Sequence, residues 1–187
     1  MTPAKMGFLI RYSSGIICTP LPPHLCDSLS LPQMLPPGSN ADPNGTAYTV
    51  SIDASHPDVT TGVSAFDRSL TCQLLSEQKP KAENFRRPGH VFPLRARNGG
   101  VLERQGHTEA AVDFCRLSGR GEAGVIAELV DDGEEVEGMA EAQGAGMMRA
   151  PACVKFARRF GLKVCTIEAL VEYRKGKEGA ATQVNGA

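Results

Sequence analysis

Five consecutive residues carry groups suited to binding an anion and moving a proton: Arg104, Gln105, Gly106, His107 and Thr108. Helix-forming residues follow directly, so the stretch is predicted to be a loop that opens into a helix. The start of a helix presents free backbone N–H groups and the positive end of its dipole, which together favour an anion. Arg104 adds a planar set of donors that matches phosphate oxygens, and His107 is suited to holding a metal or transferring a proton. A solvated surface turn is the alternative interpretation of so short a motif.

A second candidate for chemistry is Glu128, near the end of an otherwise apolar run that is predicted to be a strand over 124–130. A carboxylate is costly to bury unless it is paired or functional, and burial raises its pKa toward a useful acid–base range. The alternative is a glutamate at a strand end that simply reaches solvent.

Longer motifs surround the pentapeptide in a fixed order: Gly45–Ser51, Thr60–Arg68, Arg86–Ala96 and Gly124–Leu129. This ordered set resembles the 3,4-dihydroxy-2-butanone 4-phosphate synthase family of riboflavin biosynthesis, over about residues 2–174. The resemblance implies a lyase that converts D-ribulose 5-phosphate to L-3,4-dihydroxy-2-butanone 4-phosphate and formate. It also implies a homodimer and a divalent cofactor, Mg²⁺ or Mn²⁺, that assists enolisation, dehydration and rearrangement of the sugar.

The resemblance assigns roles to single residues of this chain. His107 corresponds to the metal ligand and Glu128 to the catalytic glutamate. Arg104, Gly106 and Thr108 correspond to the substrate-phosphate site, and Gln105 and His107 are also expected to bind the substrate. His90 is expected to line the site and contact a substrate hydroxyl, or else to make a structural hydrogen bond across the Pro88-Gly89 turn. Thr61 is a substrate contact or a helix cap, and Cys18 is either a catalytic-site thiol or a buried strand thiol.

Two segments depart from the family pattern. Residues 133–149 are rich in Gly and Glu, which predicts an exposed loop insertion. The family's N-terminal strand and acidic loop, which supply a glutamate to the metal, have no counterpart here, so the chain as written is expected to have little activity. A non-catalytic or truncated homologue that only binds the sugar phosphate is the alternative function.

Composition limits the possible classes of protein. The 187 residues carry a net charge of −1, which gives no electrostatic case for nucleic acid or a membrane surface as a partner. Six scattered cysteines without a CxxC pair indicate reduced thiols in a cytoplasmic protein. The alternation of strand and helix patterns predicts one α+β domain over 1–175, with helices packed on a mixed sheet and a disordered tail over 176–187.

Particular elements are also predicted. Ser64 is placed to cap a helix, and strands are expected over 16–19, 47–52, 91–96 and 164–166. The helix after Thr108 is expected to end near Gly119, and another to end at Gly161. The Pro-rich stretch 20–43 is predicted to be irregular.

Overall fold

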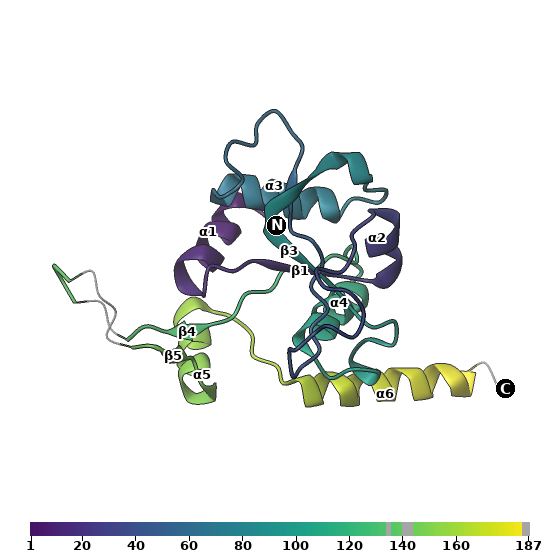
Figure 1. Ribbon diagram of the computed structural model, residues 1–187. Helices are drawn as coiled ribbons and strands as arrows, with labels where there is room; N and C mark the ends of the chain where they lie inside the picture. Colours follow the sequence, from purple (N-terminus) through teal and green to yellow (C-terminus); the bar gives the residue numbers. More distant parts are fainter. Residues whose placement is uncertain (134–135, 140–143, 185–187) are drawn as a thin grey trace.

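The computed structural model describes residues 1–133, 136–139 and 144–184. A three-stranded sheet lies at its centre, built from β1 (Cys18–Leu21), β2 (Ile52–Ala54) and β3 (Phe85–Arg95) in the order β1-β3-β2 (Figure 1). β1 runs parallel to β3, and Cys18 lies opposite Phe92; β2 is antiparallel to β3. The predicted mixed sheet is therefore confirmed, and β3 connects its two halves.

Helices α1 (Pro3–Tyr12) and α3 (Ala65–Leu75) pack against each other beside the sheet. Each begins at a hydroxyl cap: the Thr2 side chain accepts from the Lys5 N–H, and the Ser64 side chain accepts from the Asp67 N–H, as predicted for Ser64. The apolar side chains that they enclose with the sheet are Met6, Ile17, Cys72 and Val91.

A second group of elements supports the pentapeptide. Helix α4 (His107–Leu117) packs on the 3-10 helix Gly100–Leu102 and on α6 (Ile167–Val184). The core of this group consists of Val101, Ala110, Leu170 and Val171. A short helix α2 (Pro23–Ser28) and the 3-10 helix Ala82–Asn84 border a further cluster around Leu21, Ile52 and Leu75.

Helix α5 (Ala150–Phe160) approaches α1 through a cluster of four rings: Phe8, Tyr12, Phe156 and Phe160. It ends at Gly161, as predicted, because this residue adopts the left-handed conformation with φ 64°. Strands β4 (Val130–Asp131) and β5 (Gly146–Met147) form an antiparallel pair that projects away from the body in Figure 1. The described part of the segment 133–149 is largely exposed; residues 134–135 and 140–143 lie outside the described residues.

Several predicted elements were wrong in type or length. The stretch 20–43 contains the last residues of β1 and all of α2. Residues 124–129 meet the sheet at a single bridge, Cys18 to Ile126, and 164–166 form no strand. Helix α6 continues to Val184, past the predicted start of a disordered tail at 176; residues 185–187 lie outside the described residues. Among the described helices, none is long and apolar enough to cross a membrane.

Candidate functional site

The start of α4 is an open helix terminus. Gly106 occupies the N-cap position and, lacking a side chain, supplies no cap to the N–H groups of the first turn. His107 and Gln105 are exposed, whereas Thr108 is only 5% exposed. The first-turn N–H groups therefore lack a side-chain cap and can be offered to an external acceptor.

The Arg104 guanidinium lies next to this terminus and is held there by three hydrogen bonds. It donates through Nε and Nη2 to the Asn44 carbonyl oxygen, at 3.3 and 2.9 Å, and through Nη1 to Oε2 of Glu109 at 2.5 Å. These three bonds leave the second N–H of each terminal nitrogen available to a ligand. A side chain at Gly106 would collide with the Arg104 guanidinium, so the glycine permits this close approach.

Two buried carboxylates of α4, one helical turn apart, hold the loop that precedes the helix. Glu109 is 1% exposed, and its Oε1 accepts from the Arg97 N–H at 3.0 Å. Asp113 accepts from the Val101 N–H at 2.9 Å and pairs with Arg174 of α6 at 3.0 Å. The buried carboxylates of Glu109 and Asp113 thus hold the pentapeptide in position, although the sequence motifs did not single them out.

Cys18 and Glu128 lie in one neighbourhood with Tyr48. Burial raises the pKa of the Cys18 thiol from 9.0 to about 11; the negative charge of Glu128 adds to the rise, and a hydrogen bond with Tyr48 opposes it. Burial also raises the pKa of Tyr48, with Cys18 and Glu128 contributing to the rise. Cys18 is therefore a buried, protonated strand thiol beside Tyr48 and Glu128, and its catalytic role stays a prediction.

The predicted burial of Glu128 was wrong, because its side chain is exposed. The chain at Ile126 exchanges both backbone hydrogen bonds with Cys18 and then leaves the sheet, where the Glu128 carbonyl accepts from the Ser14 N–H. The carboxylate consequently faces solvent near Cys18, and it is available to a bound molecule.

The loop before Tyr48 links this neighbourhood to the pentapeptide. Asp42 accepts from the N–H groups of Asn44 and Thr46, and these bonds lower its pKa, with the charge of Arg104 contributing further. The same turn directs the Asn44 carbonyl at Arg104. Asp42 therefore lies near Arg104 and also near Tyr48, the neighbour of Cys18 and Glu128.

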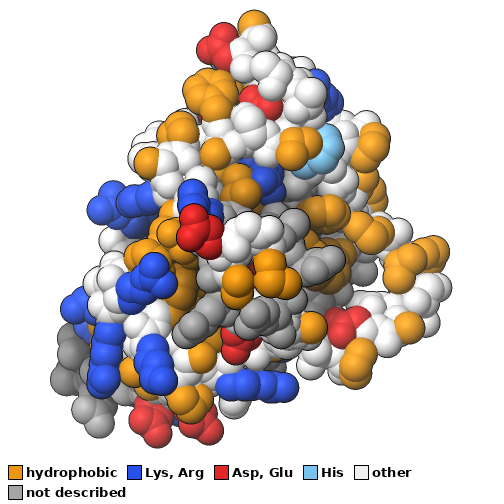
Figure 2. Space-filling model, turned by 90° about the vertical axis from the view of Figure 1, so that its left-hand side faces the viewer, with side chains coloured by type: hydrophobic (Ala, Val, Ile, Leu, Met, Phe, Trp, Pro, Cys, Tyr) orange, Lys and Arg blue, Asp and Glu red, His pale blue; other side chains and the backbone are white. Residues whose placement is uncertain are grey.

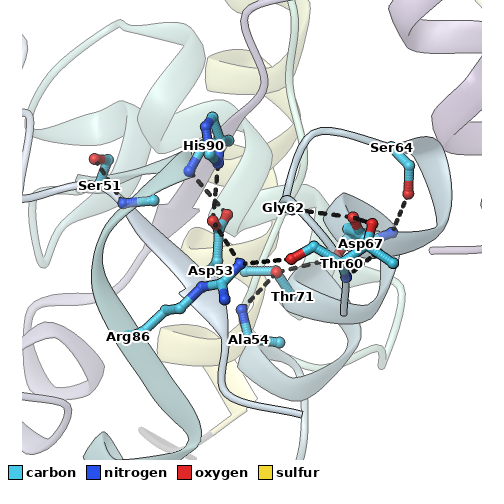
Figure 3. Close-up of polar contacts among 11 residues, drawn as sticks. Ser51, Asp53, Ala54, Thr60, Gly62, Ser64, Asp67, Thr71, Arg86 and His90 are labelled. Carbon is cyan, nitrogen blue, oxygen red and sulfur yellow. Dashed lines mark hydrogen bonds and ion pairs between the residues drawn. The ribbon is translucent and has the colours of Figure 1, made fainter. Parts of the chain in front are cut away.

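His90 belongs to a separate network, drawn in Figure 3. Asp53, 1% exposed, accepts from the His90 backbone N–H at Oδ1 and contacts its ring Nδ1 at Oδ2, both at 2.8 Å. Arg86 approaches Oδ2 at 3.5 Å. His90 lies two residues before Phe92, the residue that pairs with Cys18. Two residues of strand span roughly 7 Å, so His90 and Cys18 are offset by about that distance along β3.

Thr61 lies in the loop beside His90, between two residues that Asp67 holds. The Asp67 carboxylate accepts from the Thr60 hydroxyl at 2.8 Å and from the Gly62 N–H at 3.0 Å. Thr61 itself is exposed and is not the cap of α3, a role that Ser64 fills. The capping alternative for Thr61 is thus wrong, and the substrate contact stays a prediction.

The side chains present do not by themselves make a metal site. No group of three or more His, Cys, Asp or Glu side chains within the described part of the chain could hold an ion. Glu109, two residues after His107, already accepts hydrogen bonds at both oxygens. Mg²⁺ requires several oxygen ligands, so His107 can act only as one ligand among others that the described side chains do not provide.

Three site residues escaped sequence reasoning: Tyr48, Asp53 and Glu109. For Asp53 a signal existed, since a carboxylate between Ile52 and Ala54 interrupts an apolar strand. Glu109 looks like an ordinary acidic residue in a first helical turn, and Tyr48 lies within the Gly45–Ser51 motif but was assigned no role.

Comparison with known proteins gives a consistent result. The profile of the 3,4-dihydroxy-2-butanone 4-phosphate synthase family matches residues 1–173. A protein of that name from Pyricularia oryzae is 54% identical over 187 residues, covering 100% of this chain and 79% of its own. One from Schizosaccharomyces pombe is 46% identical over 178 residues, covering 95% and 81%.

A crystal structure of a 3,4-dihydroxy-2-butanone 4-phosphate synthase in complex with two magnesium ions superimposes with a TM-score of 0.91. It is 56% identical and covers 95% of this chain and 82% of that one. Sequence and fold therefore agree over nearly the whole chain, and this chain belongs to the 3,4-dihydroxy-2-butanone 4-phosphate synthase family.

Proposed function

We propose that the chain converts D-ribulose 5-phosphate to L-3,4-dihydroxy-2-butanone 4-phosphate and formate. One observation carries the assignment of the substrate end: the Arg104 guanidinium is fixed over the uncapped start of α4. The free N–H groups of the helix and the two remaining Arg104 donors form a site for a phosphate dianion.

The chemistry requires protons to be removed from and returned to a polyol chain. Glu128 is exposed beside the protonated thiol of Cys18, so a carboxylate acceptor and a weak donor flank the same polar region. His90 and Thr61 are proposed to contact substrate hydroxyls from the other network. Gln105, exposed in the pentapeptide, is proposed as a further substrate contact.

We also propose a requirement for Mg²⁺ or Mn²⁺ with His107 as one ligand. Support comes from the magnesium-bound relative and from the exposure of the His107 ring at the helix start. A divalent ion supplies Lewis-acid stabilisation of an enediolate.

A homodimer is proposed on the strength of the family resemblance. Exposed apolar side chains support it, among them Ile16 at 55%, Leu162 at 47% and Val164 at 59%. Figure 2 shows hydrophobic side chains among Lys and Arg on the face that includes α1 and α5. A cytoplasmic location is proposed as well, in keeping with six free cysteine thiols.

The test separates binding from turnover. Calorimetry should show binding of ribulose 5-phosphate but not of ribulose, and Arg104→Ala should weaken binding by about 1.5–3 kcal/mol, as expected for a charge-assisted contact. Arg104→Lys, which keeps the charge beside Glu109, should lose less, and Arg120→Ala at an exposed position should leave binding unchanged.

Formate release should be slow but measurable with Mg²⁺, should stop on chelation, and should be lost in Glu128→Gln. Equal binding of both sugars would remove the phosphate assignment. Phosphate-dependent binding without any formate would instead establish the non-catalytic alternative.

A further inference from the structure

The buried carboxylate of Asp53 determines the hydrogen bonding of His90 from two directions. Oδ1 accepts from the His90 backbone N–H, and Oδ2 lies 2.8 Å from the ring Nδ1. Because an ionised carboxylate only accepts hydrogen bonds, Nδ1 must carry the hydrogen. In the neutral ring the other nitrogen, Nε2, is then an acceptor.

The geometry leaves Nε2 within reach of a ligand. The His90 side chain is 49% exposed, whereas that of Asp53 is 2% exposed. The carboxylate is therefore buried beneath a half-exposed ring, next to the Thr60–Gly62 loop (Figure 3), and Nε2 makes no hydrogen bond within the described residues.

The Thr60–Gly62 loop fixes the pair in place. Gly62 has φ 87°, and a side chain there would collide with the Asp53 carboxylate and lie 2.7 Å from His90 Nδ1. Asp67 anchors the same loop through Thr60 and Gly62. The loop therefore packs closely against both members of the Asp53–His90 pair.

We propose that Asp53 is a positioning residue that makes His90 Nε2 a proton acceptor in the reaction, an inference that rests on the proposed function. A proton from a C–H or O–H group of the sugar phosphate moves to Nε2, and its bonding electron pair stays on the substrate. The resulting imidazolium keeps its Nδ1–H on Asp53, whose negative charge offsets the new positive charge. The proton later returns to the rearranged substrate or to water.

Asp53→Asn provides a directional test. The His90 backbone N–H still needs an acceptor, so the amide oxygen takes the place of Oδ1 and the NH₂ group faces the ring. Nδ1 must then accept, and the hydrogen moves to Nε2. We expect kcat to fall on the order of 10²-fold, the contribution typical of a general base, with little change in KM. His90→Gln should lose a similar factor, and combining the two changes should add no further loss.

Nitrogen-15 NMR of the neutral imidazole provides a readout that does not depend on turnover. The wild-type His90 should be in the Nδ1–H form, and the Asp53→Asn variant in the Nε2–H form. The matched control is Asp58→Asn beside His56, an exposed pair at 3.7 Å, which should leave kcat unchanged.

An Nε2–H tautomer of His90 in the wild-type protein would overturn the proposal, whether or not the chain releases formate. Unchanged kcat in an Asp53→Asn variant with a reversed tautomer would do so as well. If the Asp53→Asn variant does not fold, two measurements still test the proposal. An Nδ1–H tautomer in the wild-type protein and a lower kcat in His90→Gln would support it, and the opposite results would overturn it.

Discussion

Two buried carboxylates, Glu109 and Asp53, each hold a basic side chain, but they control different properties. Glu109 pairs with Arg104, whose charge is permanent, and so fixes where a positive charge stands. Asp53 pairs with His90, whose charge depends on protonation, and so fixes which ring nitrogen carries hydrogen. Two carboxylates of similar burial thus have different effects: Glu109 fixes the position of the Arg104 charge for binding, and Asp53 makes Nε2 of His90 the proton acceptor.

The backbone around the two carboxylates differs as well. Glu109 is part of a regular helix, with Asp113 repeating the interaction one turn later. Asp53 lies at a register shift, where Ile52 pairs with Val91 but Asp53 pairs with Arg86, so residues 87–90 bulge from β3. Gly89 packs directly on the Ile52 backbone within this bulge. A regular helix suffices to place a charge, whereas His90 is presented by an irregular strand.

The largest expected effect is on the helical side of this comparison. Glu109→Ala removes the acceptor of both Arg104 and the Arg97 N–H, so we expect the free energy of unfolding to fall by about 3 kcal/mol. Urea denaturation measures it. Glu83→Ala, which breaks an exposed pair with Lys81, should cost about 0–1 kcal/mol. Equal losses in the two variants would mean that burial adds nothing to the Arg104 contact.

A smaller effect is expected at the loop that supports His90. Gly62→Ala and Gly45→Ala both place a side chain at positive φ, 87° and 61°, but only Gly62 has close neighbours. The strain common to both is about 1 kcal/mol, and the collision with Asp53 should add about 1–3 kcal/mol at Gly62. Thermal unfolding of the two variants isolates the difference. Identical stabilities would show that the loop yields freely and does not brace the Asp53–His90 pair.

The smallest effect is expected from Cys18 and appears only at high pH. Below pH 9.0 the thiol is protonated in both folded and unfolded chains; between 9.0 and about 11 only the unfolded chain loses the proton. Stability must therefore fall as pH rises through this window, by up to about 1.4 kcal/mol per pH unit for one thiol. Cys18→Ser should have a shallower slope in urea denaturation at pH 8 to 10.5. The pKa values of Cys26 and Cys72 are also raised to about 11, so these two thiols should account for the pH dependence that remains in the variant. A slope as steep in the variant as in the wild type would place the titration elsewhere.

Local sequence signals predicted the helices well and the sheet poorly. Ser64 and Gly161 act through neighbours within a few residues, so the start of α3 and the end of α5 could be read directly. The run 124–130 is apolar enough for a strand, yet pairing depends on distant backbone: Ile126 forms a single bridge with Cys18 of the central sheet, and Val130 pairs with Met147 instead. α2 was missed because its six residues follow Pro20 and Pro22, begin with Pro23 and resemble a loop.

The site shows the same division. The pentapeptide was recognised because its anion-binding groups are consecutive in sequence. The Asp53–His90 contact joins residues 37 apart across a register shift, which no local pattern reports. The expected burial of Glu128 failed for the same reason, since it assumed a strand that the sheet does not continue.

Arg174 gives the C-terminal helix a role in holding the pentapeptide loop. Its Nη1 donates to the Gly99 carbonyl at 2.7 Å and pairs with Asp113, so α6 clamps the turn that leads to Arg104. The family match ends at residue 173, one position before this clamp. A shortened chain cut at that boundary would lose the arginine and leave Asp113 buried without its partner. The support of the pentapeptide loop therefore depends on an ion pair inside α6, one residue beyond the end of the family match.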